Sequence, residues 1–416
     1  MTLIRTGLWN GVAVLVKMLT MLGINKVLAI FVGPAGYGAL GQFQNAVQMM
    51  TTLTNGAINV GVTKYTAEFS DSESAQRTLW GTAGTLTLVS SVVAAIGIAV
   101  FHERLAVYFL HDKKYGGVFL WFAGTFVLFS FNTLLLAILN GKKEVPRYVL
   151  ANIAGSVFSL LITVSLVVWA GLYGALIGLA TYQSVSFFVT LYLSCKAPWF
   201  HFRSLIGSID RNVSINLLKY VAMAVTSAVC VPMSQILVRN HLGATLGWTA
   251  TGLWEATWRL STAYLMLATT TLSVYYLPRF SELKGWTALR EEIFKGYKLI
   301  LPASAAVSLV IYLMRDVVIA MLFTKDFAPM RELLAWQLLG DTFKIAGWML
   351  SYVMLGKAMF RLFMVTEVVF SLSFVGWTYL LTAQFGLQGA VMAHALNYAL
   401  YWGVMMFCIR RSMTQR

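Results

Sequence analysis

Apolar runs long enough to cross a bilayer recur along the whole chain. A helix needs about 20 apolar residues to cross the hydrocarbon core, and runs bounded by charged residues, Gly or Pro predict about twelve such helices. Short loops join them, so the sequence predicts an all-α polytopic membrane protein without a large extramembrane domain. The expected spans are 8–32, 40–66, 79–100, 118–140, 148–170, 175–194, 215–238, 248–277, 293–314, 333–355, 362–381 and 389–409.

Basic residues are distributed unequally between the two sides of the predicted membrane. An even number of spans places both termini on one side, and most Lys and Arg residues flank the spans there. By the positive-inside rule this side is cytoplasmic. We assign far fewer basic residues to the outer connections, namely Arg104, Lys113, Lys114, Arg239, Arg315, Lys325 and Arg331.

Composition supports membrane embedding and excludes several function classes. Of the 416 residues, 58% are hydrophobic and only 11% are charged, whereas a soluble domain typically has about 25% charged residues. The net charge of +15 follows from the topology, so nucleic acid is not an expected partner. No phosphate-binding loop or metal motif occurs, and we expect no cofactor and no metal. The first run is too long for a cleaved signal and is expected to be a retained helix.

Several short motifs recur at an offset of 215 positions. Gly141-Lys142 recurs as Gly356-Lys357, the turn that begins at Gly171 recurs at Gly386, and Lys64-Tyr65 matches Arg279-Phe280. The repeat predicts two six-helix lobes, 1–205 and 206–416, related by a parallel pseudo-twofold axis. Repeats of this kind place a substrate site in a cavity between the lobes.

The second span carries a polar stripe. Its members recur at spacings of three and four residues, so they share one face of an ideal helix. Hydrogen bonding between helices is one explanation, and the wall of a water-filled cavity is the one that we favour. The stripe consists of Gln42, Asn45, Gln48, Thr52, Asn55 and Asn59.

Two predicted spans carry oppositely charged residues at helical spacing. Glu255 and Arg259 are i,i+4, and Asp341 and Lys344 are i,i+3, so each pair can form an ion pair. A pair that only lowers the cost of insertion is an equally good explanation. Trp348, next to the second pair, could contact a sugar ring or anchor the helix at the interface.

Other charged residues have no oppositely charged residue within their own predicted helix. Lys17 and Lys26 lie in the first span, and Glu367 lies in the eleventh, where it could titrate as an ion-coupling group. A central charge costs roughly 2.5–3.5 kcal/mol on insertion scales, so it is a functional candidate. Lys64 and Arg279 end the second helix of each lobe, where snorkelling is the simpler explanation. Among the charged residues of the predicted spans, basic side chains outnumber acidic ones, which favours an anionic substrate.

One segment carries a family resemblance. Residues 326–344, with the run Met-Arg-Glu-Leu-Leu-Ala-Trp-Gln-Leu-Leu-Gly-Asp-Thr-Phe-Lys, resemble the matching segment of Wzx-type flippases. Residues 33–38, Gly-Pro-Ala-Gly-Tyr-Gly, and residues 61–65 are similar as well. The likeness extends over the length, the spans and the short loops. It implies membership of the multidrug/oligosaccharidyl-lipid/polysaccharide exporter superfamily, with two six-helix lobes around a central cavity.

The resemblance also implies a substrate. Wzx-type proteins move undecaprenyl-diphosphate-linked oligosaccharides from the inner to the outer leaflet of the bacterial inner membrane. The partners implied are this lipid-linked sugar, membrane lipids, a glycan polymerase and a chain-length regulator. The basic residues that would hold the diphosphate are Lys17, Lys26, Lys64, Arg259 and Arg279, with Lys344, Asn45, Gln48 and Asn55 completing the cavity and Glu255, Asp341 and Glu367 pairing charges or coupling ions.

Two other functions compete with this one. A drug/cation antiporter of the same fold would need a net acidic cavity, and this chain offers more cations than acids. A polytopic glycan polymerase or ligase would need a large outer loop with catalytic residues, and the predicted loops are too short. We therefore expect a flippase that works by alternating access and is not an enzyme.

Overall fold

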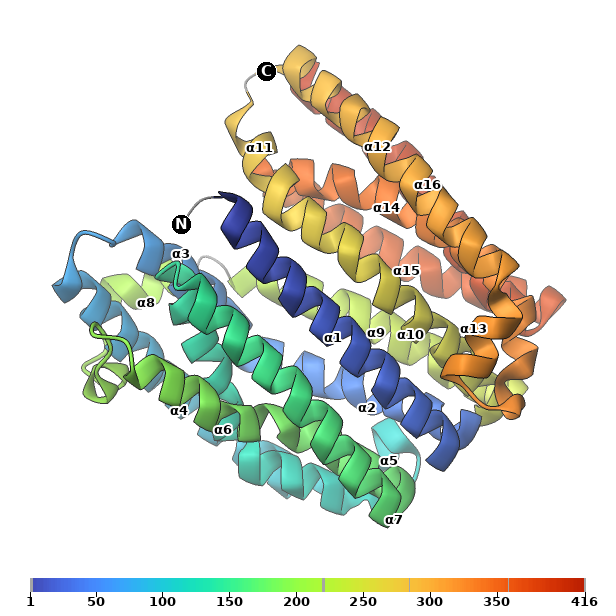
Figure 1. Cartoon of the computed structure of the whole chain (residues 1–416), viewed down its shortest axis with the longest axis horizontal. Helices are drawn as coiled ribbons and strands as arrows, with labels where there is room; N and C mark the ends of the chain where they lie inside the picture. The colour runs from blue at the N-terminus through green and yellow to red at the C-terminus, as the bar shows by residue number, and fades with distance from the viewer. Residues whose placement is uncertain (1–2, 219–220, 284, 358, 415–416) are drawn as a thin grey trace. The chain divides into compact units, whose positions relative to one another are not determined.

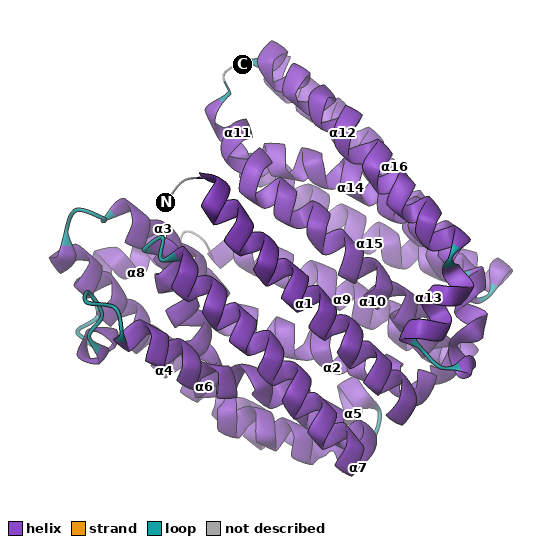
Figure 2. Ribbon diagram, in the orientation of Figure 1, coloured by secondary structure: helices purple, strands orange, loops and turns teal. Residues whose placement is uncertain are grey.

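The computed structural model describes residues 3–218, 221–283, 285–357 and 359–414 (Figure 1). Within these ranges the backbone forms helices and turns and contains no strand (Figure 2). The predicted all-α class is therefore confirmed. The elements are α1 Leu3–Phe31, α2 Gly33–Thr51, η1 Thr52–Gly56, α3 Ala57–Glu68, α4 Glu73–Val100, α5 His102–Leu110, η2 Lys113–Tyr115, α6 Gly116–Gly141, α7 Val145–Cys195, η3 Phe202–Leu205, α8 Arg211–Leu218, α9 Val221–Leu246, α10 Trp248–Thr271, η4 Leu272–Tyr276, α11 Leu277–Glu282, α12 Trp286–Leu313, α13 Arg315–Leu322, η5 Lys325–Glu332, α14 Leu334–Gly356, α15 Phe360–Phe385 and α16 Leu387–Thr414.

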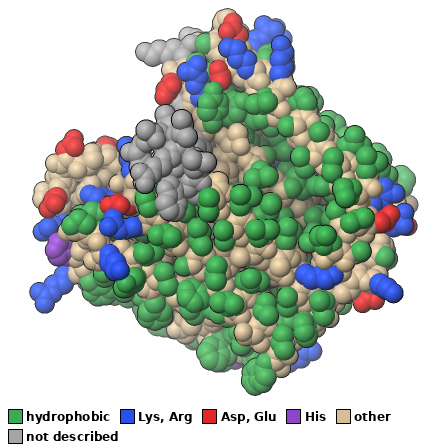
Figure 3. All heavy atoms as spheres, in the orientation of Figure 1, with side chains coloured by type: hydrophobic (Ala, Val, Ile, Leu, Met, Phe, Trp, Pro, Cys, Tyr) green, Lys and Arg blue, Asp and Glu red, His purple; other side chains and the backbone are tan. Residues whose placement is uncertain are grey.

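Seven helices of the described ranges are long and apolar enough to cross a membrane by length and composition. They include α7, which contains two predicted spans joined at a kink at Ala170 and Gly171. Helices α2, α10 and α14 are absent from this set because they carry the polar stripe and the charged pairs described above. In the displayed view, charged side chains gather toward the ends of helices and hydrophobic side chains cover their middle (Figure 3). This distribution is that of a polytopic membrane protein.

Several predicted boundaries were wrong. Helix α9 continues to Leu246, eight residues beyond the predicted end of its span at Val238, and α12 begins at Trp286 rather than at Ile293. Residues 219–220 of the predicted span 215–238 lie outside the described residues. Charged residues at the helix ends lower the local hydropathy, so an apolar window stops before the helix does.

The chain divides into two compact units. The first comprises residues 1–31 and 39–232, and the second comprises residues 32–38 and 233–416. Residues 206–232 thus belong to the first compact unit. The two lobes expected from the sequence repeat, 1–205 and 206–416, stay a prediction. The segment 32–38 packs in the second unit against α10, where a Cβ on Gly252 would lie 1.6 Å from the carbonyl oxygen of Pro34.

The two units share backbone details at the predicted offset. Gly171 has φ 53° and ψ −131°, and Gly386 has φ 56° and ψ −138°. Three residues later in each unit, a Cβ on Gly174 would lie 1.9 Å from the carbonyl oxygen of Leu166, and one on Gly389 would lie 2.3 Å from that of Leu381. Both turns need glycine for the same two reasons, a positive φ and a close backbone approach.

The two units also share features that the apolar pattern of the sequence does not predict. The second helical run of each unit contains a π-helix, η1 in the first and η4 in the second. A short helix, α5 or α13, begins directly after α4 or α12, and a 3₁₀ segment, η2 or η5, follows it. These two connections, which the sequence predicts as short loops, are therefore largely helical. The similar order of elements in both units supports the internal repeat.

The connector that follows α7, residues 196–210, is packed along α4 of the first unit. A Cβ on Gly84 would lie 1.7 Å from the carbonyl oxygen of Leu205, so the connector backbone occupies the space of that side chain. Thr85 Oγ1 donates to the carbonyl of Gly207 at 2.8 Å, and Thr82 Oγ1 accepts from the backbone N–H of Asp210 at 3.1 Å. Small and hydroxyl-bearing residues on α4 thus fix the connector.

We expect Gly84→Ala to lower the melting temperature of the purified protein. Its methyl group would collide with backbone, and overpacking of this kind costs about 1–3 kcal/mol. The matched control is Gly97→Ala in the same helix, whose Cβ meets no heavy atom within 4 Å. That variant should melt at the same or a slightly higher temperature, since Ala favours the helix. Equal melting temperatures for the two variants would contradict the packing described here.

Candidate functional site

A buried carboxylate in the second unit binds two arginines. Glu255 of α10 accepts from Arg259 Nε at 2.8 Å, one helical turn away, and from Arg239 of α9 at 2.5 Å. The side chains of Glu255 and Arg239 are 3% and 2% exposed, and that of Arg259 is 10% exposed. The predicted contact between Glu255 and Arg259 is therefore present. Two guanidinium groups share one carboxylate, so the cluster keeps one net positive charge.

Arg239 lies in a helix and not in a loop, so the prediction made for it from the sequence is wrong. We placed it in an outer connection, but it lies inside α9 and is buried beside Trp254, whose ring centroid is 5.3 Å from its guanidinium carbon. The assignment failed because the apolar window ends at Val238. Gln235, one turn earlier in the same helix, accepts from Arg239 at 3.4 Å. Gln235 and Arg239 are one helical turn apart on either side of Val238, and this spacing could have indicated that the helix continues.

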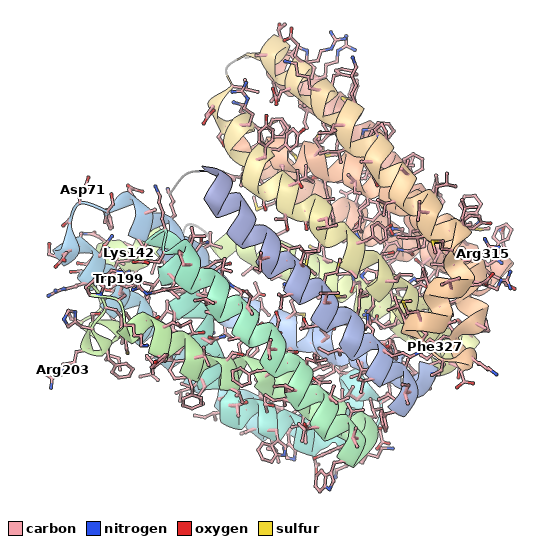
Figure 4. All side chains as sticks on the ribbon, in the orientation of Figure 1. Asp71, Lys142, Trp199, Arg203, Arg315 and Phe327 are labelled. Carbon is pink, nitrogen blue, oxygen red and sulfur yellow. The ribbon has the colours of Figure 1, made fainter. Side chains whose placement is uncertain are left out.

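The glycine-rich segment 33–38 supports this cluster. Gly33, which has a φ of 69°, is the first residue of α2. Tyr37 is fully buried, and its ring centroid lies 5.6 Å from the guanidinium carbon of Arg259. Phe327 of η5 packs edge-on against the same ring, with centroids 5.0 Å apart, and Figure 4 labels Phe327 near α13. The motif that carried part of the family resemblance thus places an aromatic ring over a buried arginine.

A second buried cluster surrounds Asp341 of α14. Tyr264 of α10 donates to its carboxylate at 2.6 Å, His394 Nε2 of α16 lies 3.0 Å from it, and Gln337 donates at 3.3 Å. Both Asp341 and His394 are fully buried. Sequence reasoning missed His394 and Tyr264, because their contacts depend on the packing of three helices. A histidine and a tyrosine inside otherwise apolar spans were the only hints.

The predicted ion pair between Asp341 and Lys344 is absent from the described residues. The carboxylate of Asp341 is taken by Tyr264, His394 and Gln337. Lys344 instead points into a box of aromatic rings, with its ammonium 4.3 Å from the centroid of Trp258, 4.9 Å from Trp348 and 5.2 Å from Tyr398. Cation–π attraction stabilises a buried ammonium without neutralising its charge.

The two clusters are joined along α10. Trp254 contacts Arg239, Trp258 contacts Lys344, and the two indole rings are 5.4 Å apart. Trp258 also packs against His394, with centroids 5.2 Å apart. Positions 254 to 264 of α10 therefore join two clusters of the second unit that together hold three basic side chains, two carboxylates and several aromatic rings. This arrangement can bind an anion and a ring-shaped polar group together.

The first unit holds neutral polar groups. Asn55, in the π-helix η1, donates to Ser130 at 2.6 Å and accepts from Ser90 at 3.2 Å, and Asn45 donates to the carbonyl of Pro232 at 3.5 Å. Gln48 is exposed, so the predicted stripe does not form one uniform face. The π-helical turn at residues 52–56 rotates the residues after it relative to those before it, so the stripe changes face in its middle.

A pocket of about 280 Å³ lies on the same helical run and is lined by Asn59, Val60, Thr63, Thr133, Leu136, Ala137, Asn140 and Tyr148.

The remaining candidate residues are not among the contacts described for these clusters. Lys17 is exposed and Lys26 is half-buried on α1. Lys64 is exposed, with its ammonium 5.1 Å from the centroid of Tyr65. Arg279 is exposed and lies 3.7 Å from the carboxylate of Glu292, and Glu367 is half-buried on α15. The five residues therefore do not form a single cluster within either unit.

Comparison with known proteins identifies the family. The profile of the polysaccharide biosynthesis protein family matches residues 3–284. The chain is 30% identical over 405 residues to the lipid III flippase of Escherichia coli K12, covering 97% of each protein, and to that of Shigella flexneri to the same extent.

Solved structures show the same fold at lower identity. An inward-facing multidrug resistance MATE family transporter of the MOP superfamily superposes with a TM-score of 0.77 at 15% identity, covering 96% of this chain and 95% of that one. A Vibrio cholerae MATE transporter gives 0.73 at 14% identity, covering 100% and 97%. The resemblance seen in the sequence is thereby confirmed, and the chain belongs to the polysaccharide biosynthesis protein family, in which it resembles the lipid III flippases over nearly its whole length.

Proposed function

We propose that this protein is a flippase that moves a lipid-linked oligosaccharide across the membrane by alternating access. The observation that carries the proposal is the 30% identity to the lipid III flippase over 97% of both chains. The substrate is an undecaprenyl-diphosphate-linked sugar, which moves from the inner to the outer leaflet of a bacterial inner membrane. Both termini lie in the cytoplasm. A glycan polymerase and a chain-length regulator are the partners that would act next on the sugar.

The alternative is a drug/cation antiporter. The MATE transporters support it through their fold, but their identity of 14–17% is about half that of the flippases. Basic side chains also outnumber carboxylates in the two buried clusters. Arg239, Arg259 and Lys344 stand against Glu255 and Asp341. A catalytic function is not proposed, since the relatives are flippases and not enzymes.

The structure changes the order of the candidate diphosphate ligands. Among the basic residues expected to hold the diphosphate, the sequence favours Arg259, which can offer paired donors to a phosphate, and Lys17, which lies near the middle of its span. Arg259 shares Glu255 with Arg239, so part of its charge is neutralised. Lys344 is 7% exposed, is surrounded by aromatic rings and has no carboxylate partner among the described residues. A buried positive charge that makes no salt bridge is the stronger anion site, because electrostatic attraction increases in a low-dielectric environment.

Aromatic rings give the same region a way to hold a sugar. Trp258, Trp348 and Tyr398 are half-buried, so parts of their faces remain accessible. A sugar ring can stack on such a face while the attached diphosphate contacts the ammonium. Lys17, which is exposed on α1, is available for a first encounter with the headgroup. We therefore assign Lys344 to the bound state and Lys17 to capture.

Transport in liposomes tests the function directly. The purified protein is reconstituted with a defined diphosphate-linked oligosaccharide, and the sugar that reaches the opposite leaflet is measured with and without a proton gradient. We expect transport that the protein accelerates over empty liposomes. Exchange of drugs or cations, without movement of any lipid-linked sugar, would support the antiporter instead.

Lys344→Gln should reduce this transport by about tenfold or more, which corresponds to about 1.4 kcal/mol. The glutamine keeps a polar side chain of similar reach but removes the charge. Lys298→Gln, an exposed position on α12 in the same unit, serves as the matched control and should leave transport unchanged. Unchanged transport in a folded Lys344→Gln protein would remove Lys344 from the binding site.

The Glu255 cluster predicts an asymmetry in stability. Glu255→Gln leaves two buried guanidinium groups without a counter-ion and should destabilise the protein by about 3–5 kcal/mol. Arg259→Gln keeps the pair between Arg239 and Glu255, so its cost should be about 1–3 kcal/mol. Thermal unfolding in detergent measures both. An equal cost for the two variants would show that Glu255 does not balance both arginines.

A further inference from the structure

A polar pocket at one end of the first unit has no role in the proposed transport. It lies between the start of α4 and the connector after α7, and its volume is about 610 Å³. Figure 4 shows Arg203 projecting from this end of the unit, with Lys142 and Trp199 close together beside it. The lining residues are Arg77, Thr78, Gly81, His201, Phe202, Arg203, Ser204, Ile206, Gly207 and Ser208.

The walls of this pocket are fixed by the backbone contacts described for α4. Gly81 approaches Gly207, with 3.4 Å between an added Cβ and the Cα of Gly207, and Thr82 Oγ1 donates to the carbonyl of Ser208 at 3.3 Å. Trp199, just before the pocket, donates to Glu144 at 2.9 Å. The connector is therefore held on both sides of the turn that carries Arg203, and the pocket is a defined feature of the unit.

The charge of the lining favours an anion. Two guanidinium groups and one imidazole line the pocket, together with three hydroxyl groups, and no carboxylate is among the lining residues. Glu73 reaches Arg77 at 3.3 Å, but both side chains are more than half exposed. An exposed pair of this kind contributes little. Each guanidinium group can still offer paired donors to a phosphate.

Apolar residues surround the same pocket. Phe202, Ile206 and Ile209 of the connector are 55%, 53% and 52% exposed. On α4, Val89, Val92 and Ile96 follow Thr78 at spacings of 11, 14 and 18 residues, so they lie on the face of the helix that begins at the pocket. These three residues are 55%, 39% and 59% exposed. The pocket thus stands at the end of an apolar stripe on a helix that is able to span the membrane.

We propose that this pocket binds the headgroup of an anionic phospholipid. The phosphodiester would contact Arg77 and Arg203, and the acyl chains would lie along Val89, Val92 and Ile96. A free phosphate would satisfy the charges but not the apolar stripe, which is why the lipid is the occupant that fits both. Basic residues next to a membrane attract anionic lipids by about 1 kcal/mol each. This inference does not depend on which substrate is transported.

Native mass spectrometry of the intact protein tests the proposal. The protein is incubated with phosphatidylglycerol, with phosphatidylcholine or with glycerol phosphate, and the retained molecules are counted. We expect selective retention of phosphatidylglycerol, and a loss of that selectivity by about tenfold in the double variant Arg77→Gln/Arg203→Gln. The control is the double variant Arg290→Gln/Arg361→Gln, which changes two exposed arginines of the second unit. This variant should retain phosphatidylglycerol like the original protein.

Other outcomes would overturn the proposal. Equal retention of phosphatidylglycerol and phosphatidylcholine, or unchanged selectivity in the double variant, would show that no anionic headgroup site exists here. Retention of glycerol phosphate as strong as that of the lipid would assign the pocket to a free anion. If the double variant does not fold, Arg203→Gln alone is measured, because Arg203 is an exposed residue of a short turn. Its selectivity should still decrease.

Discussion

Charge buried away from water constrains the second unit more than any other feature. Transfer of an ion to a low-dielectric interior costs several kcal/mol unless a partner compensates it. Glu255 compensates two arginines from α9 and α10, and this ties the two helices together at one level. The positions that follow on α10 then face α14 and α16, where Trp258 meets Lys344 and Tyr264 meets Asp341.

The clusters leave positive charge inside the second unit. One carboxylate serves two guanidinium groups, and Asp341 is occupied by His394 and Tyr264. Aromatic faces lower the cost of holding Lys344 without removing its charge. The proposed binding region would therefore attract anions, and its rings offer stacking surfaces to a sugar. The proposed substrate contains both chemical groups.

Contacts within one helix could be predicted from the sequence, and contacts between helices could not. Residues 255 and 259 are one turn apart, so their spacing alone indicates the ion pair. The spacing of Asp341 and Lys344 permits a similar pair, but Tyr264 and His394 from other helices compete for the carboxylate. Arg239 lies in a part of α9 where the hydropathy has already fallen. Backbone features that depend on glycine, such as the turns at Gly171 and Gly386, repeat in the sequence and could be predicted.

The π-helices in the second helical run of each unit determine the direction in which the side chains after them point. A π turn bonds residue i to i+5 and so accommodates one more residue than an α turn. Deletion of one residue inside a π turn would therefore close a continuous α-helix and leave the later side chains facing as they do now. Deletion of one residue at the start of the α-helix that follows would instead rotate every later side chain by about 100°. In the first unit Asn59 and Thr63 would then leave their pocket, and in the second Arg279 would turn away from Glu292. The two π turns are thus the points of these helical runs at which the chain can lose a residue without misorienting the residues beyond.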